Sequence, residues 1–338
     1  MRILLTGATG FVGSVLLPLL VAKYGKESIT VFVMPDDPFR RTIDAYDLRV
    51  VEGHVECRDD IFRAVDGSDV VIHLAGLISY WRRDKERLYS VNVQGVENIV
   101  QACLRFNVKR LIHISSVGAV GFHKKRQMLA TEETPFNWPS SFHYMQSKRC
   151  GHEIVRKAMR DDGLHAVILC PASIMGPGDP NISTPHNQIY DRIYRGFLFG
   201  SFAGGLGIVD VRDVCAAIRS AVDRTDITGI YLVAGANVEY AKVIETIAAY
   251  AGKRSHVWPI KIPGMILSIA GGIMELASFL SENRPLISFA YGRLSGWHVY
   301  YSNKKSMDAF SLTYTPFEST IADSCRYFER AFLPECPA

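Results

Sequence analysis

The chain has 338 residues, 48% of them hydrophobic, which allows one large globular domain or two closely packed ones. Its formal net charge of +4, from 38 Lys and Arg against 34 Asp and Glu, is too small to indicate nucleic-acid binding. Its seven cysteines form no C-x-x-C pair, so neither a disulfide framework nor a zinc site is predicted, and a reducing, cytoplasmic location is expected.

Short apolar runs predict the strands of the first half. The chain enters the first run at Ile3, directly after Met1 and Arg2, so no cleaved targeting peptide is expected. Each run is apolar throughout, as in strands buried on both faces, and the connections are long enough for the helices that parallel neighbours require. A doubly wound parallel α/β sheet is predicted, with strands at residues 3–6, 29–33, 70–74, 110–115 and 166–170.

A glycine-rich turn, TGATGFVG at residues 6–13, follows the first strand and opens an apolar helix that runs to about Lys23. Gly7 permits a tight turn, Gly10 lets the backbone approach a pyrophosphate, and Gly13 allows close packing of the helix. The first N–H groups of that helix would face the anion. The turn therefore predicts a dinucleotide site, with contacts from Gly7, Thr9, Gly10, Phe11, Val12 and Gly13.

A Tyr-x-x-x-Lys spacing joins Tyr144 to Lys148. On a helix this spacing places both side chains on one face, one turn apart. A free phenol has a pKa of about 10, and a neighbouring ammonium together with a positive nicotinamide ring would favour its ionised form. The pair is therefore predicted to transfer protons.

The N-terminal glycine turn and the Tyr-x-x-x-Lys pair together resemble the extended short-chain dehydrogenases/reductases, within the NAD-dependent epimerase/dehydratase superfamily. The resemblance implies a Rossmann-type fold with a smaller C-terminal substrate-binding domain. It also implies that Tyr144 transfers a proton, that Ser116 polarises the substrate oxygen, and that Lys148 binds the cofactor ribose, with hydride passing to or from the nicotinamide. Ser115 is the close competitor of Ser116.

Several local strings resemble the dihydroflavonol reductase-like and 3β-hydroxysteroid dehydrogenase-like branch of that family. They are TEETP at 131–135, GPGD at 176–179, VDVRDV at 209–214 and YSNKK at 301–305. Members of this branch mostly reduce a ketone or oxidise a secondary alcohol on apolar substrates, usually with NADP(H). In many relatives the helix after Asn92 and the helix around Tyr144 of two subunits form a four-helix interface, so the resemblance implies a homodimer.

Further cofactor contacts follow from the resemblance alone. Met34 stands where an acidic residue would bind the ribose of NAD and a basic one the phosphate of NADP. Asp36 and Asp37 come shortly after it, and Arg40 and Arg41 follow, so acidic residues typical of NAD sites and basic residues typical of NADP sites are both present. NADP(H) is preferred to NAD(H) only because of the resemblance to this branch. Asn92 matches an asparagine of the family, and both a structural and a catalytic role remain open for it. The other predicted contacts are His54, Val55, Leu74, Ala75, Gly76, Ser115, Pro171 and Ser173, besides Tyr144 and Lys148.

The second half has a looser pattern. Turn-forming residues gather at 176–185 and 204–207, and an apolar run at 229–234 predicts a strand that returns to the sheet. We therefore expect a dinucleotide-binding domain over residues 1–170 and mainly a substrate domain over 171–338. The apolar stretch 262–280 is interrupted by Pro263, Gly271, Gly272 and Glu275, so packed helices over a substrate cavity are favoured over a membrane span or an interfacial helix.

The cavity is expected to draw on residues 79–83, 118–125, 173–185 and 262–280 and to take a small, hydrophobic molecule. Basic residues at 81–83 and 123–126 would suit a phosphate, although solvated loops are favoured. Three functions remain open: a ketone or alcohol oxidoreductase, a nucleotide-sugar epimerase or dehydratase with tightly bound NAD, and a non-catalytic dinucleotide sensor. No stable membrane insertion is expected.

Overall fold

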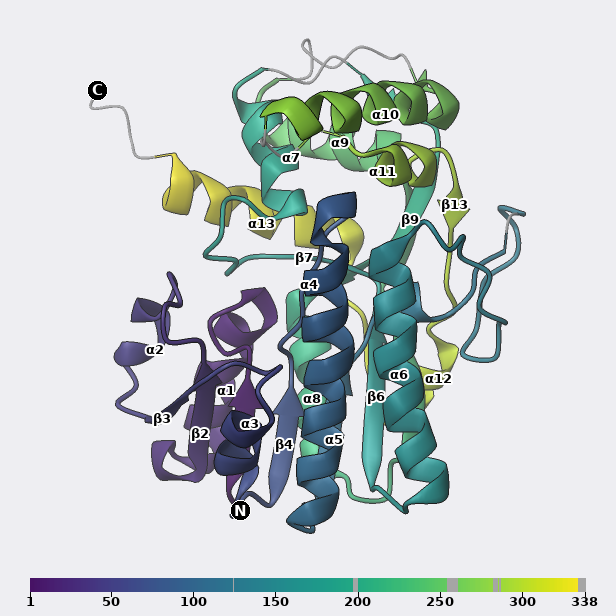
Figure 1. Ribbon diagram of the computed structural model, residues 1–338. Helices are drawn as coiled ribbons and strands as arrows, with labels where there is room; N and C mark the ends of the chain where they lie inside the picture. The colour runs from purple at the N-terminus through teal and green to yellow at the C-terminus, as the bar shows by residue number, and fades with distance from the viewer. Residues whose placement is uncertain (124, 197–199, 254–260, 282–284, 286, 334–338) are drawn as a thin grey trace.

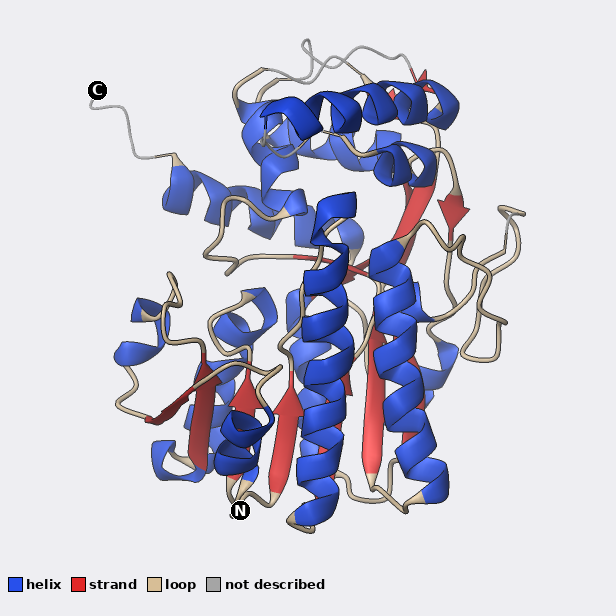
Figure 2. Ribbon diagram, viewed as in Figure 1, coloured by secondary structure: helices blue, strands red, loops and turns tan. Residues whose placement is uncertain are grey.

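The computed structural model describes residues 1–123, 125–196, 200–253, 261–281, 285 and 287–333. A seven-stranded, fully parallel sheet forms its lower part (Figures 1 and 2), in the order β10-β6-β5-β4-β1-β2-β3. The predicted Rossmann-type sheet is thereby confirmed. The strands are β1 (Ile3–Thr6), β2 (Ile29–Val33), β3 (Arg49–Glu52), β4 (Val70–His73), β5 (Arg110–Ile114), β6 (Ala166–Pro171) and β10 (Gly229–Val233).

Helices cover both faces of this sheet (Figure 1). One face carries α1 (Phe11–Tyr24), α8 (Val211–Asp223) and α12 (Lys304–Phe310), and the other carries α3 (Arg58–Val65), α5 (Gly95–Arg105) and α6 (His143–Asp161). The helix α1 continues across Pro18, whose ring removes one backbone hydrogen bond. Shorter helical segments are η1 (Lys26–Ser28), α2 (Arg41–Asp44), η2 (Arg82–Asp84), α4 (Lys85–Tyr89), the π-helical η3 (Ser90–Gln94) and η4 (Val117–Ala119).

A second body of structure lies beyond the carboxyl ends of the strands (Figure 1). Its centre is β9 (Gly205–Asp210), which pairs with β7 (Ser173–Met175), β11 (Ala236–Glu239) and β13 (His298–Val299). A separate pair joins β8 (Ser201–Phe202) to β12 (Lys261–Ile262). The helices of this body are α7 (Pro185–Tyr194), α9 (Tyr240–Tyr250), α10 (Gly264–Ser281), α11 (Phe289–Leu294) and α13 (Phe317–Phe332).

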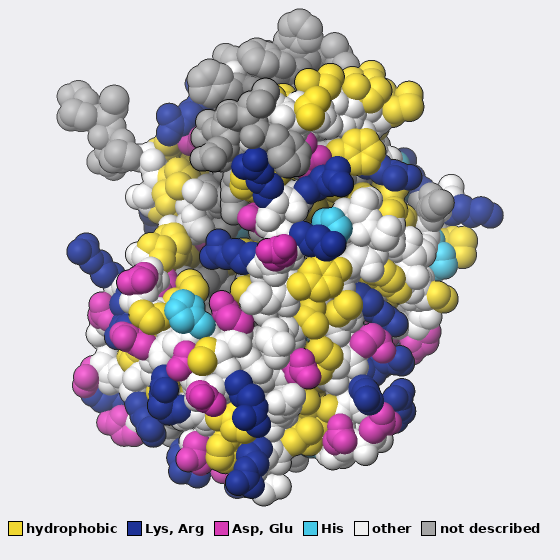
Figure 3. Space-filling view, viewed as in Figure 1, with side chains coloured by type: hydrophobic (Ala, Val, Ile, Leu, Met, Phe, Trp, Pro, Cys, Tyr) yellow, Lys and Arg dark blue, Asp and Glu magenta, His cyan; other side chains and the backbone are white. Residues whose placement is uncertain are grey.

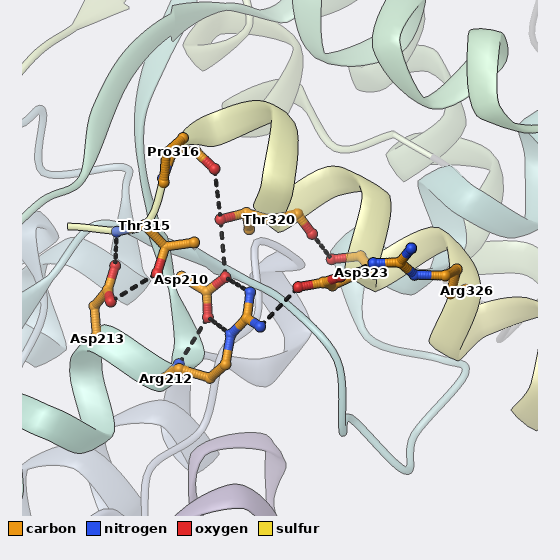
Figure 4. A network of polar contacts seen from close by, with 9 residues as sticks. Asp210, Arg212, Asp213, Thr315, Pro316, Thr320, Asp323 and Arg326 are labelled. Carbon is orange, nitrogen blue, oxygen red and sulfur yellow. Dashed lines mark hydrogen bonds and ion pairs between the residues drawn. The ribbon is translucent and has the colours of Figure 1, made fainter.

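A polar network ties α13 to the start of α8 (Figure 4). The buried carboxylate of Asp210 accepts the backbone N–H of Arg212 at 2.8 Å and the hydroxyl of Thr320 at 2.8 Å. The guanidinium of Arg212 bridges Asp210 and Asp323, each at 2.7 Å. The string VDVRDV therefore has a structural role, because it holds the C-terminal helix against the rest of the molecule.

Candidate active site

The glycine turn between β1 and α1 has the geometry of a phosphate cradle. Gly7 has φ +71°, a conformation that other residues rarely adopt. A Cβ on Gly13 would lie 2.2 Å from the carbonyl oxygen of Gly7, so α1 can approach the turn this closely only without a side chain. A Cβ on Gly10 would meet only that same oxygen, at 3.5 Å, and would otherwise enter the open cavity.

This cradle fits the pyrophosphate of a dinucleotide. Gly10 precedes the first residue of α1, and the first N–H groups of a helix have no partner within it. Those N–H groups and the positive end of the helix dipole favour an anion here. The absence of a side chain at Gly10 leaves these N–H groups accessible from the cavity.

Tyr144 lies in the first turn of α6 and is buried. Burial raises the pKa of its phenol above the ordinary value, and a hydrogen bond with Ser116 lowers it in part. The phenol is therefore protonated near neutral pH and can act as a proton donor. Its ring packs edge-on against Tyr80, with 5.7 Å between ring centroids.

The neighbouring serines after β5 have different partners. The hydroxyl oxygen of Ser116 accepts the backbone N–H of Gly118 at 3.0 Å, and the same side chain bonds Tyr144. The hydroxyl of Ser115 pairs with Nδ1 of the buried His152 at 3.2 Å. Ser116 is thus the serine whose hydroxyl meets the phenol of Tyr144.

Lys148 follows Tyr144 by one helical turn and reaches the same cavity. Its Nζ donates a hydrogen bond to the carbonyl oxygen of Ile114 at 3.1 Å. Burial lowers the pKa of this ammonium to about 8. A Cβ on Gly76 would lie 3.5 Å from Nζ, so the ammonium stands beside the chain that leaves β4.

Asn92 has a fully occupied amide. Its Oδ1 accepts the N–H of Leu77 at 2.8 Å, while its Nδ2 donates to the carbonyl of Leu77 at 2.9 Å and to the hydroxyl of Ser147 at 3.0 Å. These bonds join the loop after β4 to η3 and α6. They favour the structural alternative that the sequence left open for this residue.

A cavity of about 410 Å³ extends from the cradle to Tyr144 and into the second body. Its wall is mostly apolar and aromatic, and Tyr80, Tyr240 and Tyr291 add hydroxyl groups. Among the described lining residues, Lys148 is the only Lys, Arg, Asp or Glu side chain, and His186 is the only histidine. A site of this size and composition suits a small apolar molecule beside a cofactor.

The predicted site residues divide into two groups. Thirteen of them line this cavity: Gly7, Gly10, Phe11, Val12, Gly13, Leu74, Gly76, Ser115, Ser116, Tyr144, Lys148, Pro171 and Ser173. Thr9, Met34, His54, Val55 and Ala75 do not line it. Met34 and His54 are exposed, and Val55 packs against Gly95 at the start of α5.

The expected role of residues 262–280 is wrong. No described residue of α10 lines the cavity; α11 does so through Tyr291 and Leu294, and α10 packs on α11 from outside. The buried positions of α10 include Ser268, Glu275 and Ser278, so the apolar character of the stretch did not indicate its buried side. The basic group 123–126 also lies outside the cavity wall, with Arg126 paired to Glu239 and Lys124 outside the described residues.

Some lining residues had no signal in the sequence. Tyr240, Tyr291 and His186 come from α9, α11 and α7, three helices with no motif of their own. His186 stacks on Phe11 at 4.9 Å between ring centroids and lies 3.0 Å from Asp179. Only the folded arrangement brings these side chains to the cavity.

One acidic side chain reaches the cradle from beyond β2. The hydroxyl of Thr9 donates a hydrogen bond of 2.6 Å to Asp37, whose other carboxylate oxygen accepts the N–H of Phe39 at 2.9 Å. Arg40 turns away, because its guanidinium bonds Glu52 at 2.7 Å and Asp44 at 3.2 Å. The charged group that bonds the cradle is therefore a carboxylate.

Comparison with known proteins identifies the family of this site. The model of the NAD dependent epimerase/dehydratase family matches residues 3–234, more than half of the chain. The chain belongs to this family. It is accordingly an enzyme of the extended short-chain dehydrogenase/reductase type, with NAD-dependent chemistry at a CH–OH group.

Individual relatives extend over the whole chain. Sterol demethylase protein B of Methylococcus capsulatus is 29% identical, over 98% of this chain and all of that protein. A putative dihydroflavonol 4-reductase of Synechocystis is 25% identical, over 96% of this chain and 93% of its own. The crystal structure of gox2253 superposes with a TM-score of 0.82 at 25% identity, covering 98% of both chains. The UDP-glucose 4-epimerase of Thermus thermophilus, solved with NAD, shares the fold at a TM-score of 0.78 and 21% identity, over 98% of this chain and all of its own.

Proposed function

We propose that this enzyme reduces a ketone, or oxidises the corresponding secondary alcohol, on an apolar substrate. The observation that carries the proposal is the composition of the cavity wall at Tyr144, where Lys148 is the only Lys, Arg, Asp or Glu among the described residues. A nucleotide sugar carries a diphosphate, which proteins hold with arginine or lysine side chains. The wall supports an uncharged substrate over a nucleotide sugar.

The proposed chemistry uses three side chains. In the direction of reduction, the hydroxyl of Tyr144 gives its proton to the carbonyl oxygen as the carbonyl carbon receives a hydride, and Ser116 donates a hydrogen bond to the same oxygen. The nicotinamide, when bound, supplies that hydride and accepts it in the reverse direction. Lys148 holds the ribose and stabilises the phenolate that Tyr144 becomes. The raised pKa of Tyr144 supports its role as the donor.

The cofactor that we propose is NAD(H), in place of the NADP(H) that the branch resemblance favours. A carboxylate beside the adenosine ribose accepts hydrogen bonds from the ribose hydroxyls and repels a 2′-phosphate. Asp37 supports this choice through its hydrogen bond with Thr9 of the cradle. Arg40 is engaged with two carboxylates and does not supply the positive charge that NADP(H) needs.

The substrate class that we propose is a fused-ring alcohol or ketone of the sterol type. The support comes from the printed names of two relatives, Sterol demethylase protein B and the mouse 3 beta-hydroxysteroid dehydrogenase type 7. The mouse protein is 28% identical over 58% of this chain. The aromatic rings of Tyr80 and Tyr291, whose centroids are 5.5 Å apart and whose planes meet at 60°, supply an apolar surface for such rings.

The homodimer expected from the sequence also remains a proposal. The helices after Asn92 and around Tyr144 are α5 and α6, which lie side by side on one face of the sheet (Figure 1). Sedimentation of the purified protein would test it. A monomer at micromolar concentration would contradict it.

The test of the proposed reaction combines substrate panels with one matched pair of variants. NADH oxidation is followed with steroid and other hydrophobic ketones and then with nucleotide sugars, and NAD reduction with the alcohols. Tyr144→Phe keeps the buried ring and should lower turnover by about 10²- to 10⁴-fold, since it removes only the acid group. Tyr240→Phe, in the same cavity wall, should keep most of the turnover.

Two results would contradict the proposed reaction. Undiminished turnover in Tyr144→Phe would remove the phenol from the chemistry. Conversion of a nucleotide sugar without net oxidation of the cofactor would favour the epimerase instead.

A further inference from the structure

The helix α10 carries its large apolar side chains toward solvent. The exposed fractions of Met265, Ile273 and Leu276 are 74%, 64% and 70%, and Ile266 and Ile269 are more than half exposed. These five residues, which we call the apolar face, fall on one side of the helix because each residue turns it by 100°. A monomeric soluble protein rarely exposes a contiguous apolar surface of this kind without a partner for it.

Apart from the buried Leu267, the described residues on the opposite side of the same helix are mostly small or polar. Ser268, Gly271, Glu275 and Ser278 are buried against the protein. Burial raises the pKa of the Glu275 carboxyl. A surface helix of a soluble protein normally has the reverse arrangement, with apolar residues inside and charged residues outside. The polarity of α10 is therefore inverted.

The contact of α10 with α11 and the turn after it is built on glycine. A Cβ on Gly264 would lie 2.6 Å from the Cα of Gly296, and a Cβ on Gly292 would lie 2.4 Å from the backbone of Leu267. Close backbone approach through small residues is how helices associate in an apolar medium, where burying apolar side chains gives no advantage. This packing agrees with an apolar environment on the outer side.

Basic residues flank the apolar face. Residues 82–87, which we call the basic segment, expose Arg82, Arg83, Lys85 and Arg87 against one exposed acid, Glu86. The segment adjoins α10, because Arg82 and Trp81 line a small recess together with Glu275 and Leu276, and the indole N–H of Trp81 donates to Ser278 at 3.3 Å. In Figure 3 hydrophobic side chains gather over α10 at the top of the molecule, with Lys and Arg side chains below them.

We propose that the apolar face docks on an anionic phospholipid membrane, with its side chains in the boundary between headgroups and acyl chains. The basic segment would then meet the negative headgroups, each exposed Lys or Arg strengthening the attraction. An interfacial helix ordinarily needs a polar face of its own, and here the body of the protein takes that place. No helix within the described part of the chain is long and apolar enough to cross a bilayer, so the contact is peripheral.

A second copy of the chain is the competing occupant of the apolar face. The described, exposed residues of α10 include no Asp or Glu. The α10 helix of a second copy would therefore offer no negative charge to the basic segment. Anionic lipid supplies both the apolar layer and the negative charge. Charge complementarity therefore favours the membrane.

The helix α11 reaches from the apolar face to the wall of the cavity. Phe289, at the start of α11, is exposed beside it, while Tyr291 and Leu294 of the same helix line the cavity. If the substrate is apolar, as proposed above, docking brings the cavity close to the lipid layer in which such a substrate dissolves. Docking itself does not depend on the proposed function; only this advantage does.

The experiment is flotation of the purified protein with two kinds of vesicle, one of phosphatidylcholine and one of phosphatidylcholine with phosphatidylserine. We expect binding to the anionic vesicles, weakening as salt is added. Ile269→Glu with Ile273→Glu should lower this binding by about tenfold or more, since charge opposes entry into the apolar layer. Met128→Glu with Leu129→Glu, an exposed apolar pair outside the apolar face, should leave it unchanged.

Turnover of a water-soluble ketone by the Ile269/Ile273 variant should equal that of the wild type, which separates docking from the proposed reaction. Wild-type protein that stays with the free fraction at low salt would overturn the proposal. Equal binding by the Ile269/Ile273 variant would overturn it too. A self-associated wild type that this variant dissociates, with no vesicle binding, would assign the apolar face to a second copy instead.

Discussion

The ammonium of Lys148 is buried and donates its hydrogen bond to the carbonyl oxygen of Ile114, an uncharged partner, at 3.1 Å. No carboxylate is among the groups that shift the pKa of this ammonium. A buried cation without a counter-ion costs stability. Burial of the Lys148 ammonium therefore lowers the stability of the fold, as expected of a position kept for the proposed role of this side chain.

The first prediction concerns the stability of Lys148→Met without ligands. The pKa of Lys148 is 10.5 in the unfolded chain and about 8 in the folded protein. The destabilisation is therefore fully present below pH 8 and is lost as the pH rises from 8 toward 10.5. Lys148→Met should raise the free energy of unfolding by about 1–3 kcal/mol at pH 7 and by less at pH 10, while abolishing turnover.

Urea unfolding at the two pH values measures this effect. Lys157→Met, at an exposed position on the same helix, is the matched control and should change the free energy of unfolding little at either pH. A loss of stability in Lys148→Met at pH 7 would show that the ammonium has an ionic partner.

The second prediction separates two glycines of the cradle. Gly10→Ala adds a methyl group to open space, so we expect an unchanged melting temperature with a loss of dinucleotide affinity of about 100-fold, because the methyl takes the place of a phosphate. Gly13→Ala places a Cβ 2.2 Å from the carbonyl oxygen of Gly7, so the variant should melt well below the wild type or fail to fold. Calorimetry and titration with NADH measure both. Normal NADH binding by Gly10→Ala would place the pyrophosphate elsewhere.

The third prediction concerns the choice of cofactor. Asp37→Ser removes the carboxylate beside Thr9 and should shift the ratio of NADH to NADPH affinity by about tenfold or more toward NADPH, since one repulsive charge is lost. Asp36→Ser removes an equal charge from an exposed neighbour and is the control. Equal shifts in the two variants would mean that Asp37 acts only through the overall charge.

The fourth prediction tests the network between α8 and α13. Asp210→Ala leaves the guanidinium of Arg212 and the hydroxyl of Thr320 without their buried partner, and should lower the free energy of unfolding by about 3 kcal/mol. Asp323→Ala removes a more exposed partner of Arg212 and should cost about 1 kcal/mol. Thermal unfolding of both variants gives the comparison. Equal losses would show that the buried carboxylate contributes no more than the exposed one.

Residue patterns predicted the parts of the fold that bury continuous apolar runs. The strands β1 and β2 begin and end where the sequence predicted, and β4, β5, β6 and β10 differ from prediction by one residue at their ends. The strand β3 was missed because it lies at the edge of the sheet, where Arg49 and Glu52 are exposed and no apolar run marks it. Edge strands carry such charges as a protection against aggregation.

Local spacing predicted only those parts of the cavity wall that come from a single element. Tyr144 and Lys148 lie on one helix, and the cradle is one turn, so short motifs describe them. His186, Tyr240 and Tyr291 are brought together by long-range packing, which no spacing encodes. The direction of α10 was open to prediction, because Ser268, Glu275 and Ser278 share the buried side of the helix.

The sheet takes its last strand from a distant part of the chain. The edge strand β10 pairs with β6, although β7, α7, β8, β9 and α8 all come between them in sequence. During synthesis β6 therefore emerges long before its neighbour, and its fully buried, apolar residues have no partner on that side until the chain has passed Val233. A fragment that stops after β6 would leave one edge of this strand unpaired. We therefore expect residues 1–171 alone to aggregate and not to form a stable nucleotide-binding domain.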